Sequence, residues 1–130
     1  MNSIIDYLKK FKGYKLIYYP NPGNAGDSLI AYATMQLFRK ADLMVDWHAS
    51  DTEVDKSCIF LYGGGGNLIK EDSEACRVTA SFHARVKKLI ILPHTICNNE
   101  KLLASFGSNV DVITREMVSF SHVRSCVKEA

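Results

Sequence analysis

The sequence predicts an α/β fold in which one parallel sheet carries helices on both faces. Three observations lead to this prediction. Short apolar runs alternate along the chain with longer segments that repeat apolar residues at helical spacing. Two of these runs, Cys58–Tyr62 and Leu89–Leu92, are apolar throughout, which is typical of strands buried on both faces of a parallel sheet. Alternation of strand and helix at this spacing is typical of βαβ units.

The remaining elements follow in order between breaker residues. Gly13 ends the first helix, and Pro20 with Pro22 ends the first strand. The predicted helices cover residues 4–11, a long segment after 23–27, 73–87, 100–106 and 115–127. The predicted strands cover residues 16–19, 45–47, 58–62, 89–92 (cut by a proline) and 110–113. The long second helix is expected to turn five apolar residues inward: Leu29, Ile30, Ala33, Leu37 and Phe38.

Composition excludes several classes of protein. A chain of 130 residues can bury about two-thirds of its unfolded surface in one core, so one domain over residues 1–130 is predicted. Apolar residues make up 47% and charged residues 23%, which excludes a disordered chain. The formal net charge is +2, and the short basic run 85–88 fits the solvated end of a helix. A nucleic-acid partner is therefore not expected.

Cysteine spacing and the apolar runs bear on the compartment. The four cysteines stand apart from one another: Cys58, Cys76, Cys97 and Cys126. They form no C-x-x-C pair and no zinc-ligand spacing, so reduced thiols and no metal site are expected. The apolar runs are shorter than the roughly 20 residues of a membrane-spanning helix, and Asp6 and Lys9 interrupt any secretory signal. A cytoplasmic protein without a transmembrane segment is expected.

Unusual residues follow four of the predicted strands. Ligands of open parallel sheets collect beyond the carboxyl ends of the strands. The four clusters are residues 21–27, 63–67, 93–95 and 114–116. Because these ends lie at one edge of a sheet, the sequence predicts a single site there.

The glycine cluster Gly63–Gly66 is open to two interpretations. A glycine backbone lets a ligand approach the N–H groups closely, which favours binding of an anion or a sugar hydroxyl by Gly64, Gly65, Gly66 and the adjacent Asn67. The alternative is tight packing of strand against helix, for which one or two glycines would suffice. The cluster matches neither the dinucleotide fingerprint nor the P-loop.

The turn before the second helix carries Asn24, Gly26 and Asp27. Asn24 or Asp27 could simply cap the free N–H groups of the helix. If the turn binds a ligand, the carboxylate of Asp27 at a helix N-terminus favours neutral sugar hydroxyls over an anion.

Two further residues are candidates for chemistry. Arg115 stands in the first turn of a predicted helix, where a cation opposes the helix dipole unless an anion lies between them. An ion pair with Glu116 is the alternative. His94, after a buried strand and Pro93, is expected at the rim, where it could transfer protons or hold a backbone carbonyl.

In this order the clusters resemble the polysaccharide pyruvyl transferase family. The matching segments are Asn24–Asp27, Gly63–Leu68, Leu92–Ile96 and Thr114–Glu116 with Ser119. The resemblance implies transfer of the enolpyruvyl unit of phosphoenolpyruvate onto two sugar hydroxyls in exopolysaccharide or capsule biosynthesis, with no redox cofactor. It implies Arg115 and the glycine N–H groups as the phosphoenolpyruvate site and Asn24 with Asp27 facing the sugar. Asp27 is then a candidate base, and His94 a candidate for proton transfer.

The chain is shorter than members of that family, which pair two such lobes as in glycosyltransferases of the GT-B type. We therefore expect residues 1–130 to form the N-terminal lobe of a larger enzyme, completed by a second lobe on another chain or by a homo-oligomer. Two other interpretations of the function remain open: a nucleotide-sugar glycosyltransferase lobe, and a non-catalytic carbohydrate-binding or assembly subunit.

Overall fold

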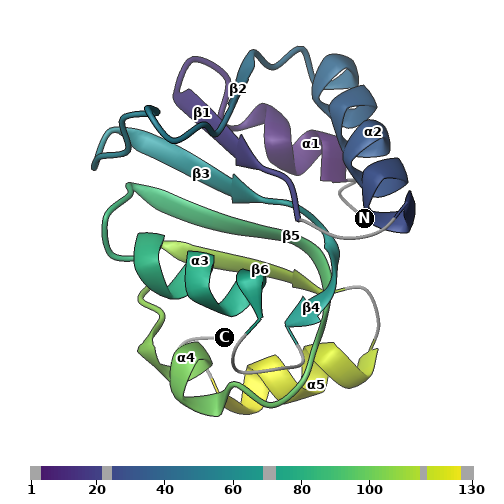
Figure 1. Ribbon diagram of the computed structural model, residues 1–130, viewed down its shortest axis with the longest axis vertical. Helices are drawn as coiled ribbons and strands as arrows, with labels where there is room; N and C mark the ends of the chain where they lie inside the picture. The colour runs from purple at the N-terminus through teal and green to yellow at the C-terminus, as the bar shows by residue number, and fades with distance from the viewer. Residues whose placement is uncertain (1–3, 22–24, 69–72, 115–116, 127–130) are drawn as a thin grey trace.

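The structure is a computed structural model that describes residues 4–21, 25–68, 73–114 and 117–126, without the side chains of 25–28, 66, 67 and 117. Within these residues, helices cover both faces of one parallel sheet (Figure 1). The strands are β1 (Lys15–Tyr19), β2 (Val45–Trp47), β3 (Cys58–Tyr62), β4 (Gly65–Leu68), β5 (Lys88–Ile96) and β6 (Val110–Thr114). The helices are α1 (Ile4–Lys9), α2 (Ala25–Lys40), α3 (Glu74–Phe82), α4 (Glu100–Ser105) and α5 (Met117–Cys126). The predicted α/β class is therefore confirmed.

The strands follow the order β2-β1-β3-β5, with β4 and β6 also paired to β5. Strands β3 and β4 are two parts of one line. Tyr62 pairs with Ile91 and Gly65 pairs with His94, so the register along β5 is unchanged from the end of β3 to the start of β4, and it shifts only within β4. Figure 1 shows β3 continuing into β4 beside the curved end of β5. The glycine cluster is thus a bend inside an extended line rather than a loop.

Two apolar clusters hold the layers together. On one face, α1 and α2 pack on the sheet through residues such as Leu8 and Phe38. On the other face, α3, α4 and α5 pack through residues such as Val78, Leu103 and Val123. The prediction that Cys58–Tyr62 is a central strand is confirmed, since every residue of β3 is buried.

The helices differ from the prediction at their ends. Helix α2 begins at Ala25, so Gly26 and Asp27 belong to its first turn and do not precede it. Its Leu29 is 71% exposed and Ala33 is exposed, so the inward prediction is wrong for both. Helix α3 ends at Phe82, five residues early, because the chain must turn back to start β5 at Lys88.

Strand β5 also differs, since it runs through Pro93 to Ile96. Proline lacks the N–H group that a sheet ladder needs, and it is tolerated at bulges. The pairing of β5 with β6 shifts by one residue between Ile91 and His94, which places Pro93 in this irregular step. The prediction that Pro93 ends the strand is therefore wrong.

Among the described residues, none of the helices combines the length and apolar character needed to cross a membrane.

Candidate functional site

The carboxyl ends of β1 and β3 form the natural binding position of this sheet. From β1 the chain crosses to β2 on one side, whereas β3 and the later strands lie on the other side. In open parallel sheets, ligands bind at the point where the strand order reverses in this way. The residues at this point are Tyr19 at the end of β1 with Asn21 after it, and Tyr62 at the end of β3 with Gly63 after it.

Close backbone packing accounts for two of the four glycines. A Cβ atom on Gly63 would lie 2.6 Å from the backbone nitrogen of Asn21, and one on Gly64 would lie 2.7 Å from the carbonyl oxygen of Pro93. Backbone atoms cannot swing aside as a flexible side chain can, so no larger residue fits. Gly64 thus has a structural reason to be glycine, whereas Gly65 and Gly66 in β4 remain candidates for ligand contact.

Strand pairing brings three of the four predicted clusters together. His94 of β5 pairs with Gly65 of β4 and also with Thr114 at the end of β6. Thr114 directly precedes Arg115 in the sequence. The fourth cluster joins this row because Gly63 lies against Asn21. The described parts of all four clusters therefore meet at one edge of the sheet.

His94 is not at the rim of that edge. It is fully buried within β5, with the centroid of its ring 5.9 Å from that of Tyr62. The expected rim position is wrong because β5 does not stop at Pro93. A buried imidazole fits a role in holding the edge together better than direct proton transfer to a bound sugar.

Several predicted residues lie wholly or partly outside the described residues. Asn24 and Arg115 are among the residues that the structure does not describe, and so is Glu116. Asp27 lies in the first turn of α2 and Asn67 in β4, but their side chains are not described.

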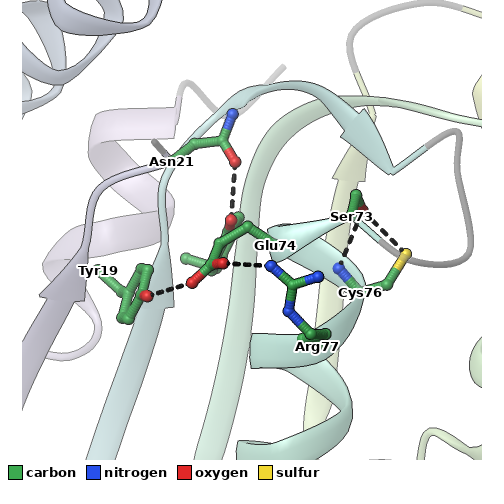
Figure 2. A network of polar contacts seen from close by, with 7 residues as sticks. Tyr19, Asn21, Ser73, Glu74, Cys76 and Arg77 are labelled. Carbon is green, nitrogen blue, oxygen red and sulfur yellow. Dashed lines mark hydrogen bonds and ion pairs between the residues drawn. The ribbon is translucent and has the colours of Figure 1, made fainter. Parts of the chain in front are cut away.

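On the face of the sheet that α3 covers, a polar network joins the end of β1 to the start of α3, beside the point where the strand order reverses (Figure 2). The sequence did not predict this network. The hydroxyl of Tyr19 donates to Oε1 of Glu74 at 2.7 Å, and Arg77 donates to Oε2 of the same carboxylate at 2.7 Å. Burial and the carboxylate together raise the pKa of Tyr19 to about 12. Hydrogen bonds from Tyr19 and Arg77 lower the pKa of Glu74. Near neutral pH, Glu74 is therefore a fixed anion and not a proton-transfer group.

Aromatic rings line the same edge, with one from each neighbouring strand. The ring of Tyr19 stacks on that of Tyr62 at 5.6 Å, and His48 lies 5.1 Å from Tyr19 on the side of β2. The hydroxyl of Tyr62 donates to Oδ1 of the buried Asn21 at 2.7 Å. Rings and hydrogen bonds thus fix the ends of β1 and β3 in one position, and both tyrosines are the last residues of their strands.

Asn99 fixes the far end of β4. Its Nδ2 donates to the carbonyl oxygens of Leu68 (3.2 Å) and Cys97 (3.0 Å), and its Oδ1 accepts from the thiol of Cys76 at 3.0 Å. Figure 2 shows Cys76 beside Ser73, whose hydroxyl caps the start of α3. Asn99 therefore connects the glycine strand β4 to α3 and to the end of β5. The spacing of Ser73 and Cys76 is the only sequence signal for this cluster.

The alkaline stability of the fold should depend on Tyr19. Because folding raises the pKa of Tyr19 from 10 to about 12, its contribution to stability is complete below pH 10 and is lost as the pH rises toward 12. In urea titrations between pH 8 and 11, the free energy of unfolding of Tyr19→Phe should decrease less with rising pH than that of the wild type. The exposed Tyr32→Phe is the control, and equal slopes for wild type and Tyr19→Phe would contradict the expectation.

The described part of the edge offers several groups for hydrogen bonding and stacking. Within the residues that the structure describes, no group of three or more His, Cys, Asp or Glu side chains is arranged to hold a metal ion. The edge offers glycine backbone at Gly65 and Gly66, aromatic rings, and the charged pair Glu74 and Arg77. Such a set can bind a polar organic molecule.

Comparison with known proteins gives one structural relative. No protein-family model and no curated protein matches the sequence. A crystal structure of a functionally uncharacterized protein from Klebsiella pneumoniae matches 95% of this chain with a TM-score of 0.88 and 29% identity. The match covers 48% of the Klebsiella chain, so the present chain spans about half the length of the protein it is similar to.

Proposed function

We propose that this chain is one lobe of an enzyme that transfers the enolpyruvyl group of phosphoenolpyruvate to a sugar, forming a pyruvate ketal. The observation that carries the proposal is the row of contacts along the carboxyl edge. Asn21 meets Gly63, Pro93 meets Gly64, and His94 pairs with both Gly65 and Thr114. The motifs that resemble polysaccharide pyruvyl transferases are therefore neighbours, as a shared site requires.

The reaction sets clear demands on such a site. The methylene carbon of phosphoenolpyruvate gains a proton, its neighbouring carbon bonds to two sugar oxygens, and the phosphate leaves. The two hydroxyl protons end on the new methyl group and on the phosphate. The site must hold a carboxylate and a phosphate, and must stabilise a cationic centre at the reacting carbon.

The residues of this chain divide these tasks in the proposal. Arg115 grips the carboxylate or phosphate, since a guanidinium binds such groups through two parallel hydrogen bonds. The N–H groups near Gly65 and Gly66 add donors beside it. Asn24 and Asp27 face the sugar hydroxyls, with Asp27 as the base. His94 is buried where β5 pairs with β4 and β6, so the proposal gives it no direct contact with the substrate.

The other half of the site is proposed to come from a second lobe. The Klebsiella chain is about twice as long as the matched region. We propose that an equivalent unit, on the same or another chain, closes the edge and supplies further cations for the phosphate. A cytoplasmic location fits the proposed use of phosphoenolpyruvate.

Phosphate release tests the assignment of Arg115. The protein assembled with its second lobe should release phosphate from phosphoenolpyruvate only when a sugar acceptor is present. Arg115→Ala should abolish this release, a loss of about a thousandfold or more, while Arg124→Ala on the exposed side of α5 serves as the control. Unchanged turnover in Arg115→Ala would contradict the proposed role of Arg115 in binding phosphoenolpyruvate.

A ligand panel separates this function from its two alternatives. Stabilisation against thermal unfolding by phosphoenolpyruvate supports pyruvyl transfer, whereas stabilisation by nucleotide sugars supports a glycosyltransferase lobe. A response to glycans alone supports a binding subunit.

A further inference from the structure

One surface of α2 carries exposed apolar side chains. Leu29 is 71% and Tyr32 is 67% exposed, and the two lie three residues apart on the helix, so they are neighbours. Met35 follows at the same spacing, and its sulfur accepts a hydrogen bond from the indole nitrogen of Trp47 at 3.1 Å. Leu29, Tyr32, Met35 and Trp47 therefore form one continuous surface, which we call the aromatic strip.

Two contacts connect the aromatic strip to the glycine cluster. Ile30, the neighbour of Leu29, lies 3.6 Å from the position a Cβ would take on Gly64. Tyr18 packs edge-on against Trp47 at 5.3 Å, and its hydroxyl lies 3.0 Å from the corresponding position on Gly63. The aromatic strip therefore lies next to the glycine cluster.

Trp47 is held in place by the protein itself. Its backbone pairs with Tyr18 in the sheet, its indole N–H donates to Met35, and its ring meets the edge of Tyr18. Even so, Trp47 remains 48% exposed. An aromatic ring that is fixed before binding loses little entropy when a ligand stacks on it.

We propose that the aromatic strip binds the acceptor carbohydrate, with pyranose rings stacked on Trp47 and Tyr32. The C–H faces of a pyranose are apolar and its rim is polar, which matches aromatic side chains that have an apolar body and a polar tip. The inference rests on the proposed function, because a sugar must lie beside the glycine cluster for its hydroxyls to react. A protein partner on the same surface is the competing occupant, and the experiment below separates the two.

The single tryptophan makes the test direct. Trp47 is the only tryptophan of the chain, so its fluorescence reports on the strip alone. A printed array of bacterial glycans and a titration with glucose and galactose tetrasaccharides provide the probes. We expect glycan retention on the array and a saturable emission change. Tyr32→Ala should weaken binding about tenfold, whereas Met44→Ala should leave it unchanged, since Met44 is 92% exposed outside the strip.

Two outcomes overturn the inference. Absence of glycan binding, or equal binding by Tyr32→Ala and the wild type, would show that the aromatic strip does not bind carbohydrate. Self-association that Tyr32→Ala abolishes, without glycan binding, assigns the strip to a protein contact. Phosphate release from phosphoenolpyruvate by the protein assembled with its second lobe keeps the two proposals apart. Glycan binding with no phosphate release contradicts pyruvyl transfer, whereas phosphate release without glycan binding contradicts only the carbohydrate assignment of the aromatic strip.

Discussion

Gly63→Ala lowers the free energy of unfolding by about 3 kcal/mol, because the new methyl group has no space. It would lie 2.6 Å from the backbone nitrogen of Asn21 and 3.1 Å from Cα of Pro20. Relief requires the end of β1 to move away from β3, which would also stretch the hydrogen bond between Tyr62 and Asn21. Urea denaturation measures the loss, and it should accompany weaker ligand binding at the edge.

Gly107→Ala is the matched control for this substitution. A Cβ on Gly107 would meet only the side-chain oxygen of Asn109, at 3.3 Å. That side chain can shift by a few tenths of an ångström, so the change in stability should stay within about 1 kcal/mol. Equal losses for the two variants would mean that glycine content, and not the close approach of β1 and β3, sets the cost.

Asn99→Ala lowers the free energy of unfolding by a similar amount, about 3 kcal/mol. The substitution removes the donor to the carbonyl oxygen of Leu68 and the acceptor of the Cys76 thiol, and both of these hydrogen bonds are buried. It also places alanine at a backbone φ of 59°, in the left-handed region that asparagine tolerates better. Chemical denaturation followed by circular dichroism gives the value.

The neighbouring asparagine separates the two contributions. Asn98 has nearly the same backbone conformation, with φ of 53°, but its side chain is exposed. Asn98→Ala should therefore lower the free energy of unfolding by about 1 kcal/mol, since it strains the same backbone region but removes an exposed amide whose contact with the sulfur of Cys97 is long, at 3.7 Å. Asn99→Gly relieves the backbone strain but lacks the amide. Its loss of unfolding free energy should therefore lie between those of Asn98→Ala and Asn99→Ala. If Asn98→Ala and Asn99→Ala were equal, the amide of Asn99 would not hold β4 to α3.

The candidate site could be predicted from the sequence only as far as the edge on which it lies. Polar and glycine residues after apolar runs located the edge, because parallel strands bring their carboxyl ends together. The partners of those residues could not be predicted. Tyr19 and Glu74 are 55 residues apart, and Asn99 reaches Leu68 across 31 residues. Such pairs depend on how helices sit on the sheet, which no local pattern records.

The sequence by itself determined the class of fold and the order of the helices and of every strand except β4, because apolar periodicity follows local backbone geometry. Only the tertiary structure decided where each element stops and what it faces. Pro93 predicted the end of a strand, yet β5 continues because a bulge against β6 absorbs the missing N–H group. Leu29 matched the inward face of a helix, yet it is exposed because the register of α2 on the sheet favours Phe38 and Thr34. Burial is a property of the packed molecule, and a single segment cannot specify it.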